Sequence, residues 1–190
     1  MHSSPRHARA AFSLIELMTV IAIIVILAGL IVGGLSYAAE RQAKEKCRVQ
    51  LALLSKGIEA YKLDMGNYPD SKLSGTGSQS LYVQLFYQGY DYKQNPNRSD
   101  TLNAPMAKTI YLPELDPTSS KQGWVTAVTT VTPPPTTTIL DPWGKEYGYR
   151  TNTDTDAQNP DFDLWSMGKD GYTDGLNPRF PQLKDDIKNF

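Results

Sequence analysis

The sequence predicts an α+β fold in which one long N-terminal helix packs on a small antiparallel sheet. An apolar run over residues 12–35 is followed by an amphipathic pattern over residues 36–66, and no proline interrupts either stretch. This pattern predicts a single helix whose first half is apolar on all faces and whose second half is apolar on one face only. After Pro69, residues 145–150 and 161–166 alternate between apolar and polar side chains, which predicts a hairpin of two strands.

The composition excludes several classes of function. The 190 residues include 19 Lys and Arg against 20 Asp and Glu, so the formal net charge is −1 and no nucleic-acid binding is expected. Cys47 is the single cysteine, and His2 and His7 are the only histidines, so an internal disulfide and histidine-based catalysis downstream are both excluded. Catalysis by carboxylates alone is the remaining enzymatic alternative, and we expect no enzyme.

The apolar run over residues 12–35 has the length of a transmembrane helix. At about 1.5 Å per residue it extends roughly 36 Å, enough to cross a hydrocarbon core of about 30 Å. A soluble core helix would show a polar face, which this run lacks. A secretory signal peptide is also a poor match, because its apolar part is shorter, about 7–15 residues, and its small residues follow that part. Here Ala10 and Ala11 precede the run.

Glu16 is the only charged residue within the apolar run. A carboxylate at the bilayer centre costs several kcal/mol unless it is paired, although one near the end of a span can extend towards the interface. Cleavage before Phe12 would create a cationic amine about 6 Å away along the same helix. A partner from a neighbouring chain is the second possibility in a packed bundle.

The segment around Glu16 resembles a known processing site. Residues 11–18, Ala-Phe-Ser-Leu-Ile-Glu-Leu-Met, are similar to the prepilin site of type IV pilins and pseudopilins, and Arg6 and Arg9 make the leader basic. The resemblance implies that a membrane peptidase cleaves between Ala11 and Phe12 and N-methylates Phe12. It also implies that Glu16 neutralises the new amine during filament assembly.

Two positions depart from that pattern. Ala11 stands where the family usually has Gly, and Gly33 stands where it often has Pro. Gly33 and Gly34 still weaken a helix, because glycine loses much backbone entropy on folding. We therefore expect a bend or fraying there, and local unwinding near Gly33 in an assembled fibre.

The amphipathic half of the helix predicts a spine for the distal domain, ending at Gly66 and Asn67. The segment Tyr61–Pro69 resembles the same region of the major pseudopilins of the type II secretion system, and so do residues 141–150 and 161–171. The predicted core face of this half recurs at helical spacing and consists of Cys47, Leu51, Leu54, Ile58, Tyr61 and Met65.

The distal domain is expected over residues 67–190, with residues 70–140 as a variable insertion. Within that insertion, residues 81–92 are compatible with a helix or a strand, because periodicity alone cannot decide. Residues 123–132 are rich in β-branched side chains and predict a further strand.

The C-terminal loop, residues 164–190, is a candidate cation site. It contains Asp170, Asp174, Asp185 and Asp186 among several glycines. Calcium binds six to eight oxygens from carboxylates and backbone carbonyls, although Asp-Gly pairs are also ordinary turns. The resemblance to major pseudopilins implies a structural calcium here. By position in that family the Met167 carbonyl and the Asp170 carboxylate match best as ligands. Position does not fix which carboxylates complete the site, and we choose Asp174 and Asp186.

The resemblance implies a structural subunit of a periplasmic pseudopilus that supports protein secretion. Its fold would be type IV pilin-like, with residues 1–11 as a cytoplasmic leader that is removed, and it would be a single-pass protein of the bacterial inner membrane. Expected partners are other copies in a helical filament, minor pseudopilins, the prepilin peptidase, an inner-membrane assembly platform and membrane lipid. The alternative is a surface type IV pilin for adhesion, motility or DNA uptake, although such pilins often carry a C-terminal disulfide that this chain cannot form.

Overall fold

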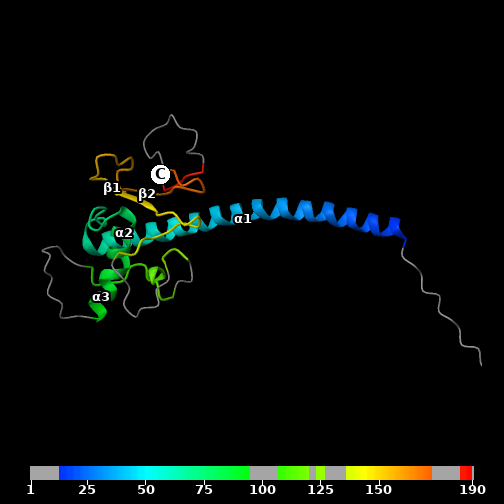
Figure 1. The fold of residues 1–190 in the computed structure, drawn as a ribbon. Coiled ribbons are helices and arrows are strands. Elements are labelled where there is room, and N and C mark those ends of the chain that lie inside the picture. Colours follow the sequence, from blue (N-terminus) through cyan, green and yellow to red (C-terminus); the bar gives the residue numbers. More distant parts are fainter. Residues whose placement is uncertain (1–12, 95–106, 120–122, 127–135, 173–184, 190) are drawn as a thin grey trace, which may run out of the picture. The chain divides into compact units, whose positions relative to one another are not determined.

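The computed structural model describes residues 13–94, 107–119, 123–126, 136–172 and 185–189, with the side chains of residues 30–35 outside that description (Figure 1). The chain divides into two compact units, residues 1–42 and 43–190. Helix α1, Leu14–Met65, is 52 residues long and contributes to both units. It is unbroken at Gly33 and Gly34, so the fraying expected there is not found in the single chain.

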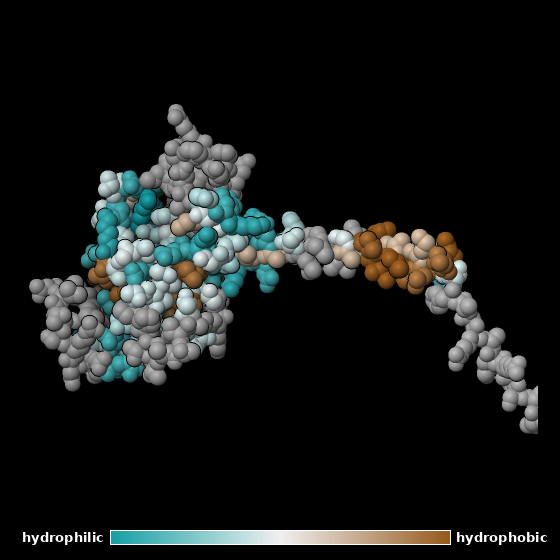
Figure 2. Space-filling model, in the orientation of Figure 1, coloured by the Kyte–Doolittle hydropathy of each residue, from teal (hydrophilic) through white to brown (hydrophobic). Residues whose placement is uncertain are grey.

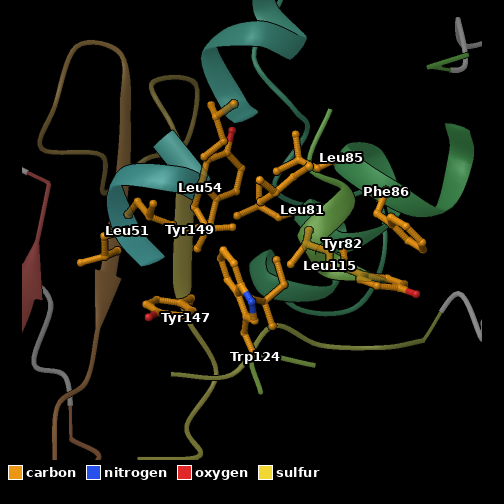
Figure 3. Close-up of a cluster of buried hydrophobic side chains, with 14 of the residues drawn as sticks. Leu51, Leu54, Leu81, Tyr82, Leu85, Phe86, Leu115, Trp124, Tyr147 and Tyr149 are labelled. Carbon is orange, nitrogen blue, oxygen red and sulfur yellow. The ribbon is translucent and has the colours of Figure 1, made fainter. Parts of the chain in front are cut away.

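The second half of α1 supplies the spine of the second unit, as the sequence predicts. Its predicted core face is buried: Leu54 and Ile58 are 0% exposed, and Met65 packs against the cluster while partly exposed. Figure 3 shows Leu51 and Leu54 among aromatic and leucine side chains from later segments. The helix ends at Gly66, whose φ of +81° is a left-handed conformation that favours glycine.

Residues 77–94 form consecutive helical turns, which settles the choice left open for residues 81–92. They are α2 (Gly77–Tyr82), the π-helical η1 (Val83–Tyr87) and α3 (Gln88–Gln94), and a short 3₁₀ turn, η2 (Pro113–Leu115), follows later. Leu81 and Leu85 are both 0% exposed, and their spacing of four residues places them on one helix face against the core. Tertiary burial therefore selects the helix here.

The sheet is antiparallel with the order β1-β2-β3. Strands β1 (Gly148–Thr151) and β2 (Phe162–Ser166) form the predicted hairpin, with Tyr149 opposite Leu164. Strand β3 (Ile187–Lys188) pairs with the end of β2 and returns the C-terminus to the sheet. Strand β2 is the central strand, and every one of its residues is buried.

The strand predicted over residues 123–132 is wrong for residues 123–126, which form no strand, and residues 127–132 lie outside the described residues. Trp124 and Val125 are nearly completely buried in the core cluster. One backbone hydrogen bond joins this segment to a neighbour, from Leu140 N–H to the Trp124 carbonyl. The apolar residues here fill the core without entering a ladder.

Candidate functional site

The first part of α1 presents apolar side chains on all sides. Leu14 is 77% exposed and Ile15 is 67% exposed, and the large apolar residues up to Leu27 are at least 47% exposed in the single chain. Figure 2 shows this segment as a continuous hydrophobic surface. Such a surface is unfavourable in water, so a second apolar phase or another apolar surface must cover it.

Glu16 lies in the first turn of α1, with its side chain exposed between these apolar neighbours. A negative charge is favourable there because the free N–H groups give the helix N-terminus a partial positive charge. The next basic residue along the helix after Glu16 is Arg41, so the apolar stretch itself supplies no cation. Ala11 and Phe12, the predicted cleavage site, lie outside the described residues.

Among the residues that the structure describes, no helix is both long enough and apolar enough to count as a membrane span. Of the span expected over residues 12–35, residue 12 lies outside the description, and so do the side chains of residues 30–35.

The C-terminal loop begins where β2 ends, and β3 brings Asp185 back to it. Gly168 and Gly171 adopt φ values of +64° and +71°, so the backbone turns twice within four residues. The Asp185 carboxylate accepts hydrogen bonds from the backbone N–H groups of Lys169 at 2.9 Å and Asp170 at 3.2 Å. Asp185 therefore closes the loop, a role that sequence spacing did not assign to it.

Three of the four predicted calcium ligands lie in the described residues, beside the point where the end of β2 pairs with the start of β3. Met167 follows β2 directly, and the Asp170 carboxylate accepts from Tyr172 N–H at 2.9 Å. The Asp186 side chain is buried, with Oδ2 at 3.9 Å from Lys188 Nζ. Asp174 lies outside the described residues. Within the described part of the chain, no three acidic, histidine or cysteine side chains converge as a metal site.

A buried polar network lies behind this loop. Asp141 is 3% exposed, and its carboxylate accepts from Trp143 N–H at 3.0 Å, Lys145 N–H at 2.8 Å and Ser166 Oγ–H at 2.6 Å. Ser166 is fully buried and its Oγ accepts from Gly168 N–H at 3.1 Å. The sequence predicts only a turn at Asp141, because nothing in its spacing reveals a partner 25 residues away.

The same network reaches the spine helix. Tyr147 Oη donates to Gln50 Oε1 at 2.7 Å and lies 3.5 Å from Cys47 Sγ. Burial raises the pKa of the Cys47 thiol, so the thiol is uncharged at neutral pH. Cys47 is a buried core residue, as the sequence predicts.

The family assignment follows from a match of the sequence to family models. Residues 6–32 match the prokaryotic N-terminal methylation motif, which covers the predicted cleavage site and Glu16. Residues 79–180, more than half of the chain, match the family of type II secretion system protein G. The chain belongs to the type II secretion system protein G family. The predicted role as a structural subunit of a type II secretion pseudopilus is thereby confirmed.

Two individual proteins are similar to the chain. The chain is 28% identical to the type II secretion system core protein G of Escherichia coli K12 over 160 residues, which cover 84% of this chain and 81% of the relative. A solved structure, the major pseudopilin from the type 2 secretion system of enterohaemorrhagic Escherichia coli, aligns with a TM-score of 0.42 at 18% identity. That alignment covers 82% of this chain and 92% of the solved one.

Proposed function

We propose that this protein G homologue polymerises through its N-terminal helix into a periplasmic pseudopilus after cleavage between Ala11 and Phe12. The exposed apolar surface of residues 14–27 carries the proposal, because it must be covered by lipid before assembly and by neighbouring helices after it. In this proposal the precursor lies in the inner membrane, with its distal domain in the periplasm. The methylation motif over residues 6–32 supports N-methylation of Phe12 by the prepilin peptidase.

In this proposal Glu16 sets the register between subunits. Its carboxylate stands among exposed apolar side chains, and within the helix the next cation is Arg41. The mature amine of Phe12, on the same or a neighbouring subunit, is the partner that processing supplies. Leaving the carboxylate unpaired among packed apolar helices is unfavourable, so misregistered subunits are selected against.

Filament assembly in cells that carry the secretion machinery tests the role of Glu16. We expect Glu16→Ala and Glu16→Gln to lower the yield of filaments at least tenfold, because both remove the charge that pairs with the amine. Glu45→Gln is the matched control, since Glu45 lies on the same helix and only forms an exposed ion pair with Arg48 at 2.6 Å. Electron microscopy and immunoblotting of sheared fractions measure the yield. Normal filaments from Glu16→Ala would contradict the proposal.

For this role we propose as partners other pseudopilins, the assembly platform and membrane lipid. The subunit itself would do no chemistry, and the energy for assembly would come from elsewhere in the machinery. Imaging separates this function from that of a surface pilin: short periplasmic filaments are expected, and long surface fibres would favour adhesion, motility or DNA uptake.

We also propose a structural calcium in the C-terminal loop. The donors are chemically suitable, because calcium takes carboxylate and backbone carbonyl oxygens from irregular loops. The Met167 carbonyl, the Asp170 and Asp186 carboxylates and, in the undescribed part of the loop, Asp174 would hold it. The closure of the loop by Asp185 supports this assignment, since it returns the C-terminal segment to residues 169 and 170.

The melting temperature of the full chain in detergent tests the calcium proposal. Calcium at about 100 times its dissociation constant would stabilise the fold by about 2.7 kcal/mol, a rise of roughly 5–10 °C that chelation reverses. We expect Asp170→Asn to abolish the rise. Asp116→Asn is the matched control, because Asp116 makes the same kind of turn, accepting from Thr118 N–H at 2.8 Å. A melting temperature that calcium and chelator leave unchanged would contradict the site.

A further inference from the structure

We propose that Asp141 and Ser166 form a buried support that fixes the first turn of the C-terminal loop and thereby sets its affinity for calcium. The inference rests on the proposed calcium site, but neither residue belongs to the expected ligand set. Both side chains are almost fully buried behind the loop, and they lie 25 residues apart in the chain.

The direction of the hydrogen bonds in this support is fixed by chemistry. An ionised carboxylate only accepts, so Ser166 must donate its single hydroxyl proton to Asp141 Oδ2 at 2.6 Å. Its lone pairs then remain free to accept from Gly168 N–H at 3.1 Å. The two backbone donors on Asp141 Oδ1 hold the carboxylate itself in place. The turn at Asp141 therefore determines where Ser166 can hold Gly168.

Asp185 also packs closely against Gly168. Its φ is +64°, and a Cβ at this position would lie 2.7 Å from the Asp185 carbonyl oxygen and 2.8 Å from Asp185 Cγ. Gly168 therefore contacts both Ser166 and Asp185, and no larger residue fits here without moving Asp185. The carbonyl of Met167 and the carboxylate of Asp170 stand on either side of this point, so the support orients both expected ligands.

An ordinary turn would not need this arrangement. The two backbone N–H groups on Asp141 Oδ1 suffice to form the local turn, and they come from residues two and four positions further on. The third bond, to Ser166, connects the turn to the end of β2, where the loop begins. A buried carboxylate is costly unless its oxygens are paired, so removing the hydroxyl perturbs both partners.

We expect Ser166→Ala to release Gly168 N–H and to weaken calcium binding roughly tenfold, the usual effect of losing a group that orients a metal ligand. Ser78→Ala is the matched control. Ser78 is also fully buried, and its Oγ exchanges two hydrogen bonds with the backbone of Ile139, at 2.9 Å and 2.7 Å. Both variants lose stability, but only Ser166→Ala acts on the loop.

Two measurements on the full chain in detergent micelles test the support. Hydrogen exchange without calcium reports on the amides of Gly168, Lys169 and Asp170, and calorimetric titration with calcium chloride gives the affinity. In Ser166→Ala we expect exchange at these amides at least tenfold faster and affinity about tenfold weaker, with both unchanged in Ser78→Ala. Asp141→Asn should act in the same direction. The Asn side-chain amide can donate a hydrogen bond to Ser166 Oγ, so the Ser166 hydroxyl would no longer donate to residue 141. This variant replaces Ser166→Ala in the test if Ser166→Ala does not fold.

The outcomes separate the two proposals. The proposed role of Asp141 and Ser166 would be wrong if amide exchange and calcium affinity were unchanged in Ser166→Ala. It would also be wrong if both changed equally in Ser78→Ala. A wild-type chain that takes up no calcium would contradict the calcium site, while the exchange rates at Gly168, Lys169 and Asp170 would still decide whether Asp141 and Ser166 fix the turn. Restored protection in Ser166→Thr, which keeps the hydroxyl, would support the assignment further.

Discussion

At the scale of single residues, Asp154 shows how one carboxylate joins distant segments. Its Oδ2 accepts from Ser71 Oγ–H at 2.6 Å and Thr151 N–H at 2.9 Å, and its Oδ1 lies 2.6 Å from Lys72 Nζ. Although burial by itself raises the pKa of Asp154, the hydrogen bonds from Lys72, Ser71 and Thr151 outweigh it and lower the pKa to about 2. The segment after α1 is thereby attached to the end of β1.

This lowered pKa predicts a defined dependence of stability on pH. Because the pKa is lower in the folded chain than in the unfolded one, the contribution is complete above about pH 5 and is lost as the pH falls towards 2. We expect Asp154→Asn to lower the free energy of unfolding by about 1–2 kcal/mol at pH 7, and the difference from wild type to shrink below pH 4. Urea unfolding measures it.

The control for this prediction is Asp156→Asn, since Asp156 is exposed on the same loop and its side chain lacks these bonds. A loss of stability in Asp154→Asn that persists unchanged at pH 2 would show that the carboxylate charge is not its cause.

At the scale of secondary-structure elements, the amphipathic half of α1 carries most of the predictable architecture. Cys47, Leu51 and Leu54 lie where a period of 3.6 residues places them, and the periodicity alone identified the buried face. The hairpin was predictable from the alternation of apolar and polar residues, which matches the alternating burial of β1, whereas all residues of β2 are buried. Residues 123–126 misled the prediction, because β-branched residues are equally suited to filling a core.

Burial on this helix can be tested directly. We expect Leu54→Ala to lower the free energy of unfolding by about 2–5 kcal/mol, because the 0% exposed side chain leaves a cavity among closely packed neighbours. Val49→Ala is the matched control: Val49 lies on the same helix but is 60% exposed, so a change within about 0.5 kcal/mol is expected. Tryptophan fluorescence during urea unfolding measures both. Equal effects of the two substitutions would contradict the assigned core face.

At the scale of the whole molecule, the apolar surface and the folded core belong to different parts of the chain. The described core cluster begins at Cys47, whereas the exposed apolar side chains lie mainly between Leu14 and Leu27. The first segment therefore contributes little to folding of the second unit within the described residues, and it remains available for lipid and for neighbouring subunits. The proposed filament depends on this separation between the exposed apolar surface and the folded core.

The sequence by itself determined the long helix, its two kinds of surface, the isolated charge of Glu16 and the family to which the chain belongs. These features depend on local periodicity and on a contiguous motif. Residues close together in the sequence are therefore sufficient to predict them. Only the tertiary structure decided that residues 81–92 are helical, that Asp185 closes the C-terminal loop and that Asp141 reaches Ser166. Each of these depends on which segments pack together, and a hydrogen bond across 25 residues leaves no periodic trace in the sequence.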